Sequence, residues 1–510
     1  MISIPLPNSE TEQADVCLIV EGCYPYVAGG VANWLDWLIR SLPDVRFAVV
    51  AVIADERPMT WHYQLPKNVV SFKDLPLSRR LRKPSGLSEP RLHAQSFCDL
   101  LCRVIEKADL EAFAELCSVL NPPAHRRSGL LARRGEAMSL DKLMSSRFSW
   151  DVMALAYERL APSSSFPDFF WAWRTLVGGL YSILIAPLPP ASAYHTISTG
   201  YAGLFAARAA VMTGCRAAIT EHGIYTNERR IDLTLANWIP DSIGFSLGRI
   251  DDRVDLRQFW IQTFEAYARL CYGACARITT LYGENQSFQM ALGAPGEKLD
   301  VIPNGIHIEK FAGFERATGQ PPTVALIGRV VPIKDIKTYI AAVARLKMRI
   351  PDLRALLLGP TDEDPEYFKQ CQQMVRDLGL ERTLVFTGKV NIVDYLPQID
   401  VLVLTSISEA QPLVLLEAGA ASIPCVTTDV GSCREIIEGR PDEDPKLGSA
   451  GRVVRLMDPE GTADAILALM SDPELRRACG ERLRQRVNRY FTSDASAARY
   501  AALYRDLRAT

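Results

Sequence analysis

Two glutamates stand eight residues apart in the string SISEAQPLVLLEAG, which covers residues 406–419. The apolar run before it predicts a buried strand. Pro412 predicts the start of a helix, because a first turn does not need the N–H that proline lacks. Glu409 then lies in the connecting loop and Glu417 in the second turn of the helix. Both carboxylates can therefore face one cleft and accept hydrogen bonds from hydroxyl groups.

Each glutamate also has a simpler interpretation. Glu409 can be a carboxylate that favours the helix dipole, and Glu417 can be a solvated surface residue. Glu417 follows Leu415 and Leu416 and precedes Ala418, however, which is an unusual setting for an idle charge. We therefore favour a binding role for both carboxylates.

Two cations follow another predicted strand, TVALIGRVV at 323–331. Arg329 and Lys334 come at its end, directly before a predicted helix. Ligands of parallel α/β sheets bind at the carboxyl ends of the strands. Arginine offers phosphate a planar fork and lysine a point charge, while the helix start at Pro412 and Leu413 adds free N–H groups. Either cation alone is typical of a surface, but together they predict a diphosphate site.

Further candidates lie in the first half of the chain. Gly29 and Gly30 separate an apolar strand pattern from a helical one. They can let N–H groups approach a diphosphate, or they can form a tight turn that requires positive φ. His222 ends a predicted strand and is a catalytic candidate, with a hydrogen-bonded structural residue as the alternative. His195 has a similar position and is the weaker candidate.

The composition describes an ordinary globular protein. The chain has 510 residues, which is more than one hydrophobic core usually supports, so two domains are expected. A net charge of −2 gives no overall field that would indicate a nucleic-acid or membrane-surface protein. The N-terminus lacks the pattern of a secretory signal. The twelve cysteines are accordingly expected to be reduced, mostly buried thiols in a cytoplasmic protein.

Short apolar strands alternate with helical patterns in both halves, which predicts two doubly wound, Rossmann-like α/β domains. We expect the first at 1–316, with a helical insertion at about 76–168, and the second at 317–487. Residues 314–322 read as a linker and 488–510 as a C-terminal helix. The apolar segment 176–194 is interrupted by prolines, so it predicts a buried helix and a loop rather than a membrane span.

Two common nucleotide motifs do not occur. The first strand–helix turn reads GCYPYVAGGVAN and lacks the dinucleotide fingerprint G-x-G-x-x-G. The chain also has no G-x-x-x-x-G-K-[ST] string. Dehydrogenases and P-loop phosphotransferases are therefore unsupported.

Four strings together carry a family resemblance. GRVVPIKD at 328–335, SISEAQPLVLLEA at 406–418, IPNGI at 302–306 and TEHG at 220–223 resemble the retaining GT-B glycosyltransferases of family 4. The resemblance covers both domains except the insertion. The strings at 23–35 and 220–230 are most similar to family members of Pel-type exopolysaccharide (biofilm) biosynthesis.

The resemblance implies a function and its residues. It implies transfer of a hexose from a UDP-sugar to a growing glycan with retention of configuration, without a metal or other cofactor and without nucleic acid. Arg329 and Lys334 would neutralise the diphosphate, Glu417 would bind ribose, Glu409 would contact the sugar, and His222 would lie near the reacting centre. The remaining implied donor contacts are Val390 beside the uracil, Pro412, Leu413, Gly29, Gly30 and Asn304, which would also shape the interdomain hinge with Gly305.

The resemblance also implies partners: inner-membrane polysaccharide synthase subunits that would recruit a cytoplasmic enzyme. One residue departs from the family pattern, because Ala410 stands where glycine usually follows the first glutamate. If that loop requires positive φ, alanine would disturb it. The alternative hypothesis is a non-catalytic sensor or scaffold that binds a nucleotide sugar. A phosphorylase that uses pyridoxal phosphate has no supporting lysine motif.

Overall fold

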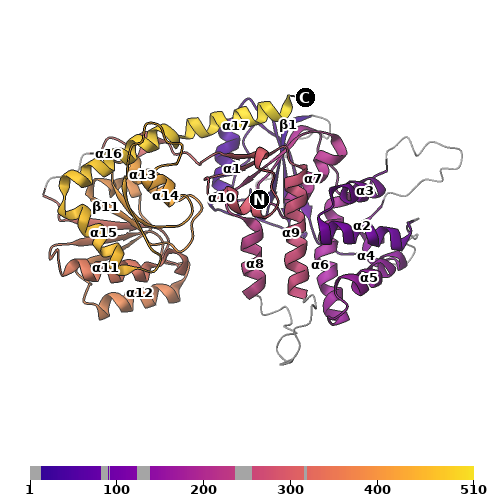
Figure 1. Cartoon of the computed structure of the whole chain (residues 1–510), viewed down its shortest axis with the longest axis horizontal. Coiled ribbons are helices and arrows are strands. Elements are labelled where there is room, and N and C mark those ends of the chain that lie inside the picture. The colour runs from indigo at the N-terminus through magenta and orange to yellow at the C-terminus, as the bar shows by residue number, and fades with distance from the viewer. Residues whose placement is uncertain are drawn as a thin grey trace. The chain divides into compact units, whose positions relative to one another are not determined.

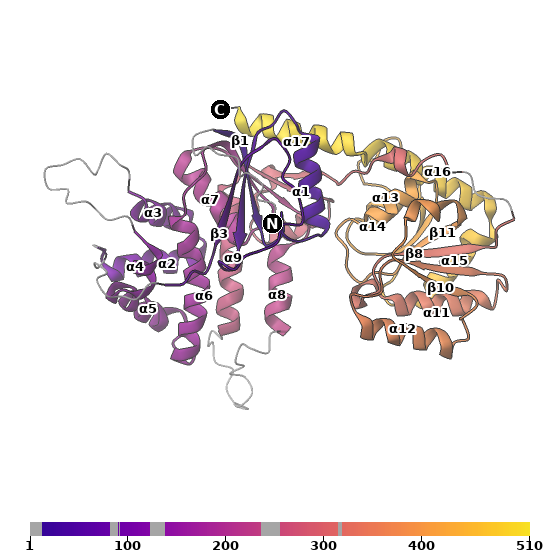
Figure 2. The same ribbon diagram turned by 180° about the vertical axis from the view of Figure 1, so that it is seen from behind.

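The computed structural model describes residues 13–81, 90, 92–122, 138–235, 256–314 and 319–509. The chain divides into two compact units (Figures 1 and 2). Unit 1 comprises Met1–Thr280, Gln286–Asp300 and Ala501–Thr510, and unit 2 comprises Leu281–Asn285 and Val301–Tyr500. Residues 82–89 and 123–137 of the predicted helical insertion and residues 315–318 of the predicted linker lie outside the described residues.

Unit 1 contains a seven-stranded sheet in the order β3-β2-β1-β4-β5-β6-β7. The pairs from β3 through β6 are parallel. Its central strands are buried along their length, as parallel strands covered on both faces require. The strands are β1 (Ala14–Glu21), β2 (Phe47–Ile53), β3 (Val69–Pro76), β4 (Ala191–Thr196), β5 (Ala217–Glu221), β6 (Arg277–Thr280) and β7 (Leu299–Val301).

The described residues between β3 and β4 form five successive helices, which share one apolar core with the sheet. The longest, α6, confirms the buried helix predicted before the Pro187–Pro190 loop. In the described ranges no helix combines the length and hydropathy needed to cross a bilayer. The helices of unit 1 are α1 (Gly30–Ser41), α2 (Ala94–Lys107), α3 (Leu110–Leu120), α4 (Leu140–Ser145), α5 (Arg147–Leu160), α6 (Phe166–Ile185), α7 (Tyr201–Thr213), α8 (Tyr225–Leu235), α9 (Leu256–Ala274) and α10 (Asn285–Ala291).

Unit 2 contains a six-stranded sheet in the order β10-β9-β8-β11-β12-β13, and all five pairs are parallel. Alternate residues of β8 enter different cores: Val324 and Leu326 pack on one face, Ala325 and Ile327 on the other. The predicted fold class, two Rossmann-like parallel-sheet domains, is therefore confirmed. The strands are β8 (Thr323–Ile327), β9 (Arg354–Leu358), β10 (Leu384–Gly388), β11 (Val401–Leu404), β12 (Cys425–Thr428) and β13 (Gly451–Val454).

The helices of unit 2 lie on both faces of its sheet (Figures 1 and 2). The helix predicted after β8 is α11. The C-terminal helix predicted at 488–510 corresponds to the end of α16 and to α17. The helices are α11 (Ile336–Lys347), α12 (Pro365–Asp377), α13 (Leu413–Ala420), α14 (Cys433–Glu438), α15 (Pro459–Ser471) and α16 (Pro473–Tyr490). The last helix, α17 (Ser493–Arg508), begins in unit 2 and continues into unit 1.

The last ten residues of the chain pack within unit 1. Tyr504 is buried, with its ring 5.9 Å from that of Phe47. Asp506 accepts hydrogen bonds from Arg216, and Arg508 pairs with Asp15. The C-terminal residues of α17 thus pack in the same core as the first strands of the chain.

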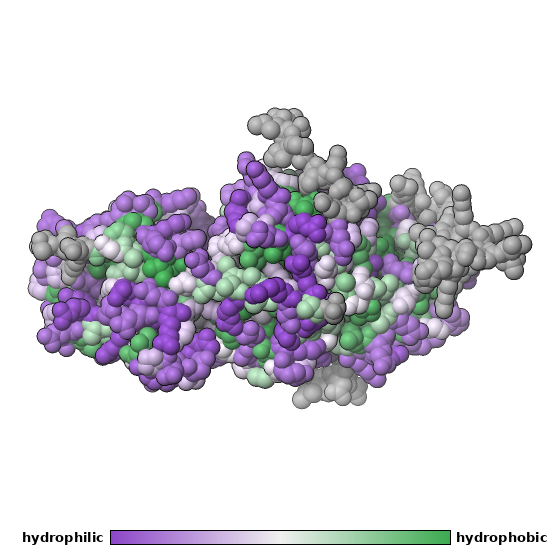
Figure 3. All heavy atoms as spheres, turned by 90° about the horizontal axis from the view of Figure 1, so that it is seen from above, coloured by the Kyte–Doolittle hydropathy of each residue, from purple (hydrophilic) through white to green (hydrophobic). Residues whose placement is uncertain are grey.

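The cysteines behave as expected for buried thiols. All twelve are free, and ten of them are buried. On the face drawn in Figure 3, hydrophobic residues form separate patches among hydrophilic ones, as on an ordinary protein surface.

Candidate active site

An ion pair joins two of the predicted residues at the carboxyl edge of the unit 2 sheet. Lys334 ends the short 3₁₀ turn Pro332–Lys334 after β8, and Glu409 lies in the loop after β11. Lys334 Nζ donates to Glu409 Oε1 at 2.5 Å, and the two side chains are only 17% and 15% exposed. Thr405 Oγ1 donates to the Lys334 carbonyl at 2.9 Å and fixes the turn. The fold therefore brings this predicted cation and carboxylate together.

The loop that carries Glu409 is held from the side of β12. Gly431 has φ +52°, and a Cβ there would lie 2.2 Å from the Glu409 carbonyl oxygen. The Ser432 N–H donates to the Ala410 carbonyl at 2.8 Å. Ala410 itself does not have positive φ. Alanine at this position is therefore compatible with the loop, and the glycine that the close approach requires is Gly431.

Gln411 links the same loop to Asn304. The Asn304 N–H donates to Gln411 Oε1 at 2.8 Å, and Gln411 Nε2 donates to the Asn304 carbonyl at 3.1 Å. Gln411 is buried, so this reciprocal pair satisfies polar groups that would otherwise be costly. Asn304 Oδ1 is buried without a partner among the described residues. Asn304 thus joins the site through its backbone, while its side-chain oxygen is available.

Helix α13 begins at Leu413, one residue later than predicted, because Pro412 precedes it as an extended residue. The N–H groups of Leu413 and Val414 have no backbone acceptor in the described chain, so the helix start keeps its positive potential. Glu417 lies on the helix, and burial raises the pKa of its carboxyl. No described residue donates a hydrogen bond to it. Glu417 is therefore an acceptor without a partner among the described residues.

The other predicted residues of unit 2 lie at the same sheet edge. Arg329 follows β8 and forms an ion pair with Glu363, with about half of each side chain exposed. Val390 follows β10 and is half-buried against the core. Between them, the Gly359 N–H donates to the Gly388 carbonyl at 3.0 Å. Arg329 does not contact the Lys334–Glu409 pair, so it is a separate cation at the rim.

Three buried polar groups at this edge were not predicted. Ser406 Oγ, Ser432 Oγ and Asp335 Oδ2 have no hydrogen-bond partner in the described parts of the chain. Buried polar groups are normally paired, so an unpaired group calls for an explanation. All three follow strands, and that position is the signal by which the sequence could have indicated them. Together with the α13 start they indicate that a polar ligand completes this edge.

In unit 1, His222 directly follows β5. Its ring lies 4.5 Å from the Trp34 ring in an edge-on arrangement. Both imidazole nitrogens are shielded from solvent, and neither has a partner among the described residues. Burial lowers the pKa of His222 to about 4, so the ring is neutral near pH 7. No described residue therefore provides the hydrogen bond that the structural alternative requires of His222.

His195 is that structural residue. Its Nδ1 lies 2.8 Å from the Tyr504 hydroxyl and its Nε2 lies 2.8 Å from Thr220 Oγ1. The side chain is fully buried, and burial lowers the pKa of His195 to about 3. The lower ranking of His195 as a catalytic candidate agrees with these contacts.

Gly29 and Gly30 begin α1 at the carboxyl side of β1. Gly29 has φ 176°, which is extended backbone, and Gly30 is the first helical residue. Neither glycine lies in the left-handed region, so the predicted alternative of a turn that requires that conformation is wrong. Both are exposed, and an added Cβ would meet nothing within 4 Å. The α1 start is therefore open to solvent on this side.

A buried carboxylate lies next to His222. Glu221 Oε2 accepts hydrogen bonds from the Tyr272 hydroxyl at 2.6 Å and from Gln289 Nε2 at 2.9 Å. Glu221 Oε1 and Gln289 Oε1 have no described partner. Burial outweighs the two bonds and raises the pKa of Glu221 to about 7. The neutral, protonated form is thus favoured below that pH.

We expect Glu221→Gln to change how stability depends on pH. The carboxyl pKa is raised from its ordinary value of 4.5 to about 7, so the folded wild type keeps a proton that the unfolded chain loses between these values. Its free energy of unfolding should then fall as pH rises through this window, by about 3 kcal/mol at most. Glutamine cannot ionise, so the variant should gain stability relative to wild type from pH 5 to pH 8.

Urea unfolding at these two pH values measures the effect, with Glu158→Gln, a change at an exposed carboxylate, as control. Equal stability differences between Glu221→Gln and wild type at both pH values would show that Glu221 is ionised throughout.

Two family models match the chain. Residues 14–297 match the model described as "Domain of unknown function (DUF3492)". Residues 308–486, which carry the Lys334–Glu409 pair and α13, match "Glycosyl transferases group 1".

The individual proteins similar to this chain align with only part of it. N-acetyl-alpha-D-glucosaminyl L-malate synthase of Bacillus anthracis is 33% identical over 34% of this chain and 43% of its own length. D-inositol 3-phosphate glycosyltransferase of Corynebacterium urealyticum is 30% identical over 41% of this chain and 51% of its own length. The chain thus spans about half the length of the curated relatives it matches.

A solved structure matches nearly the whole chain in fold. The crystal structure of HepE from Anabaena in complex with UDP and glucose aligns with a TM-score of 0.55 at 14% identity. The alignment covers 96% of this chain and 99% of that protein.

Proposed function

The chain belongs to the DUF3492 family, and a glycosyl transferases group 1 domain follows the DUF3492 region in the sequence. We propose that the protein transfers a hexose from a UDP-sugar to a growing glycan. The observation that carries the proposal is the arrangement at the unit 2 sheet edge. Three groups there offer complementary contacts to a nucleoside diphosphate: Lys334, the N–H groups at the start of α13, and the Glu417 carboxylate. Neither those N–H groups nor that carboxylate has a partner in the described parts of the chain.

The charges of the edge suit this chemistry. When the acceptor hydroxyl oxygen bonds to the anomeric carbon, the bond from that carbon to the diphosphate oxygen breaks. UDP leaves with the bonding electrons, and the hydroxyl proton is released. Lys334, Arg329 and the start of α13 stabilise the negative charge that develops on UDP. Glu417 accepts from the ribose hydroxyls, and Glu409, held by Lys334, faces the sugar.

The family resemblance supports three further proposals. The reaction retains the anomeric configuration, it needs no metal ion, and it serves Pel-type exopolysaccharide biosynthesis together with membrane synthase partners. We also propose a catalytic role for His222, whose ring is neutral and has no hydrogen-bond partner among the described residues. The crystal structure of HepE in complex with UDP and glucose supports a uridine nucleotide as the first donor to test.

The sensor or scaffold hypothesis loses one of its two supports. It rested on Ala410 in the loop after Glu409 and on the helical insertion, and Ala410 does not adopt positive φ. A screen of several UDP-sugars for steady release of UDP separates the two functions. The enzyme releases UDP over many turnovers when a glycan acceptor is present, whereas a sensor binds the nucleotide sugar and releases none.

UDP should bind in the micromolar range without any added metal. The positive potential at the site comes from Lys334, Arg329 and the α13 helix start, and these groups can neutralise a diphosphate directly. Calorimetry in EDTA measures this affinity, and the same titration with added magnesium is the comparison. Binding that appears only with magnesium or manganese would contradict the prediction.

A further inference from the structure

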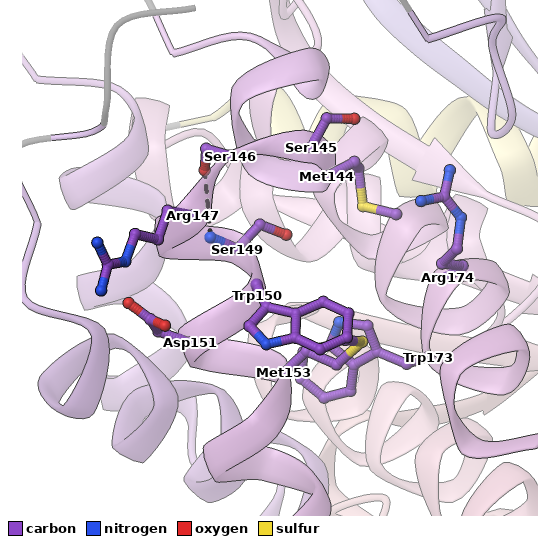
Figure 4. A pocket seen from close by; sticks show the side chains of 10 residues that line it. All are labelled: Met144, Ser145, Ser146, Arg147, Ser149, Trp150, Asp151, Met153, Trp173 and Arg174. Atoms are coloured by element: carbon purple, nitrogen blue, oxygen red, sulfur yellow. Dashed lines mark hydrogen bonds between the residues drawn. The ribbon is translucent and has the colours of Figure 1, made fainter. Parts of the chain in front are cut away.

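A cavity of about 590 Å³ opens among the helices of unit 1, between α4, α5 and the middle of α6 (Figure 4). Its volume lies within the range of about 300–1,000 Å³ that is typical of small-molecule sites. No residue of the candidate active site lines it. The cavity therefore needs its own explanation.

Aromatic and thioether groups form the apolar part of the cavity. The Trp150 indole lies across it, with Trp173 and Met153 behind and Met144 to one side (Figure 4). Trp150 is 52% exposed, although tryptophan is usually covered. Its ring packs 5.7 Å from the Phe166 ring, which holds it in place. The cavity thus presents a fixed aromatic face to solvent.

Charged groups of both signs stand around this aromatic face. Arg147 and Asp151 lie on one side of the cavity and Arg174 on the other (Figure 4). Within the described ranges, no donor bonds Asp151 and no carboxylate pairs with Arg174. The Arg174 guanidinium lies 5.5 Å from the Phe170 ring, which restricts its position. Acceptors and donors therefore surround an apolar surface.

We infer that this cavity binds a neutral oligosaccharide. A hexose has an apolar C–H face that can stack on Trp150, and hydroxyl groups that can donate to Asp151 and accept from Arg174. An alkyl chain would cover these charged groups without pairing them, which is costly. A polyanion would meet the Asp151 carboxylate, and a polycation would meet both arginines. The mixed rim thus favours a neutral polar ligand.

The inference rests on the proposed function in one respect, namely that the ligand is the glycan being extended. A second binding site on the same protein raises the effective concentration of a long acceptor without any new contact at the reacting centre. The cavity would therefore retain the growing chain between transfer steps.

The test is direct binding, measured by calorimetry with maltopentaose, cellopentaose and penta-N-acetylchitopentaose as probes. At least one of them should bind wild type, and Trp150→Ala should weaken that probe by about tenfold or more because the stacking face is lost. Asp151→Asn should also weaken it. Trp171→Ala is the matched control, since Trp171 is 66% exposed on α6 but does not line the cavity, and it should bind as wild type does.

The outcomes separate this site from the donor site. UDP affinity should be equal in wild type and Trp150→Ala, which shows that the variant is folded. Failure of all three probes at millimolar concentration would overturn the inference, as would equal binding by Trp150→Ala. Binding of dodecanoate through Trp150 in place of the sugars would overturn it in favour of an apolar ligand. If the probes bind through Trp150 but no UDP is released, the site stands and the proposed transferase function falls.

Discussion

Replacing Arg329 by alanine should lower the turnover of sugar transfer by about 10²–10³, the scale expected when one preorganised charge-stabilising group is removed. The leaving UDP gains negative charge as the glycosidic bond breaks, so a cation at the carboxyl end of β8 acts mainly in the transition state. The Arg329 side chain is 52% exposed, so its loss should cost the fold little. Steady-state UDP release measures the effect.

Two further variants test whether the cation itself is responsible for this effect. Glu363→Gln removes the ion-pair partner of Arg329 but keeps the cation, so turnover should stay near that of wild type. Arg329→Lys keeps a charge but loses the planar fork, so its turnover should lie between those of wild type and the alanine variant. If the alanine variant is folded and turns over normally, Arg329 does not belong to the donor site.

Glu409→Gln and Glu417→Gln should impair the protein in different ways. Glu417 is assigned to ribose, which UDP contains, whereas Glu409 is assigned to the sugar, which UDP lacks. Loss of a hydrogen bond to a charged acceptor costs about 1.5–3 kcal/mol, so Glu417→Gln should weaken UDP by roughly tenfold or more. Glu409→Gln should leave UDP affinity nearly unchanged and sharply lower sugar transfer.

Glutamine is the suitable replacement at both positions. At residue 409 its amide oxygen can still accept from Lys334 Nζ, so the contact to that cation survives. At residue 417 burial already raises the pKa of the carboxyl, so a neutral side chain should be tolerated. UDP calorimetry and turnover, measured on both variants, distinguish the roles. A larger loss of UDP affinity in Glu409→Gln than in Glu417→Gln would show that the roles are misassigned.

The sequence predicted the central strands of both sheets and missed an edge strand in each. The predicted runs, such as β8 and β11, are buried throughout and mostly apolar because helices cover both faces. The edge strand β3 contains the exposed residues Lys73 and Asp74, and the edge strand β13 contains Arg452. Edge strands are partly solvated and often charged, so their composition resembles that of loops.

The charged residues of the site could be predicted because their position after a strand already restricts where they lie. The groups that hold the site in place could not. Gln411 bonds Asn304 across 107 residues of sequence, and Gly431 is required only because another loop approaches it closely. His222 and His195 have similar positions in the sequence pattern. Only His195 is hydrogen-bonded by Tyr504, which lies 309 residues away in the sequence.

The contribution of the C-terminal residues to unit 1 affects how the protein folds during its own translation. Phe47 and His195 leave the ribosome early, but the tyrosine that covers them is residue 504. The 200 residues from Val301 to Tyr500, all assigned to unit 2, must be translated in between, which takes roughly 10–40 s at about 5–20 residues per second. The nascent first unit therefore stays incomplete throughout this interval, and the protein depends on translation reaching the end of α17 before that core can close.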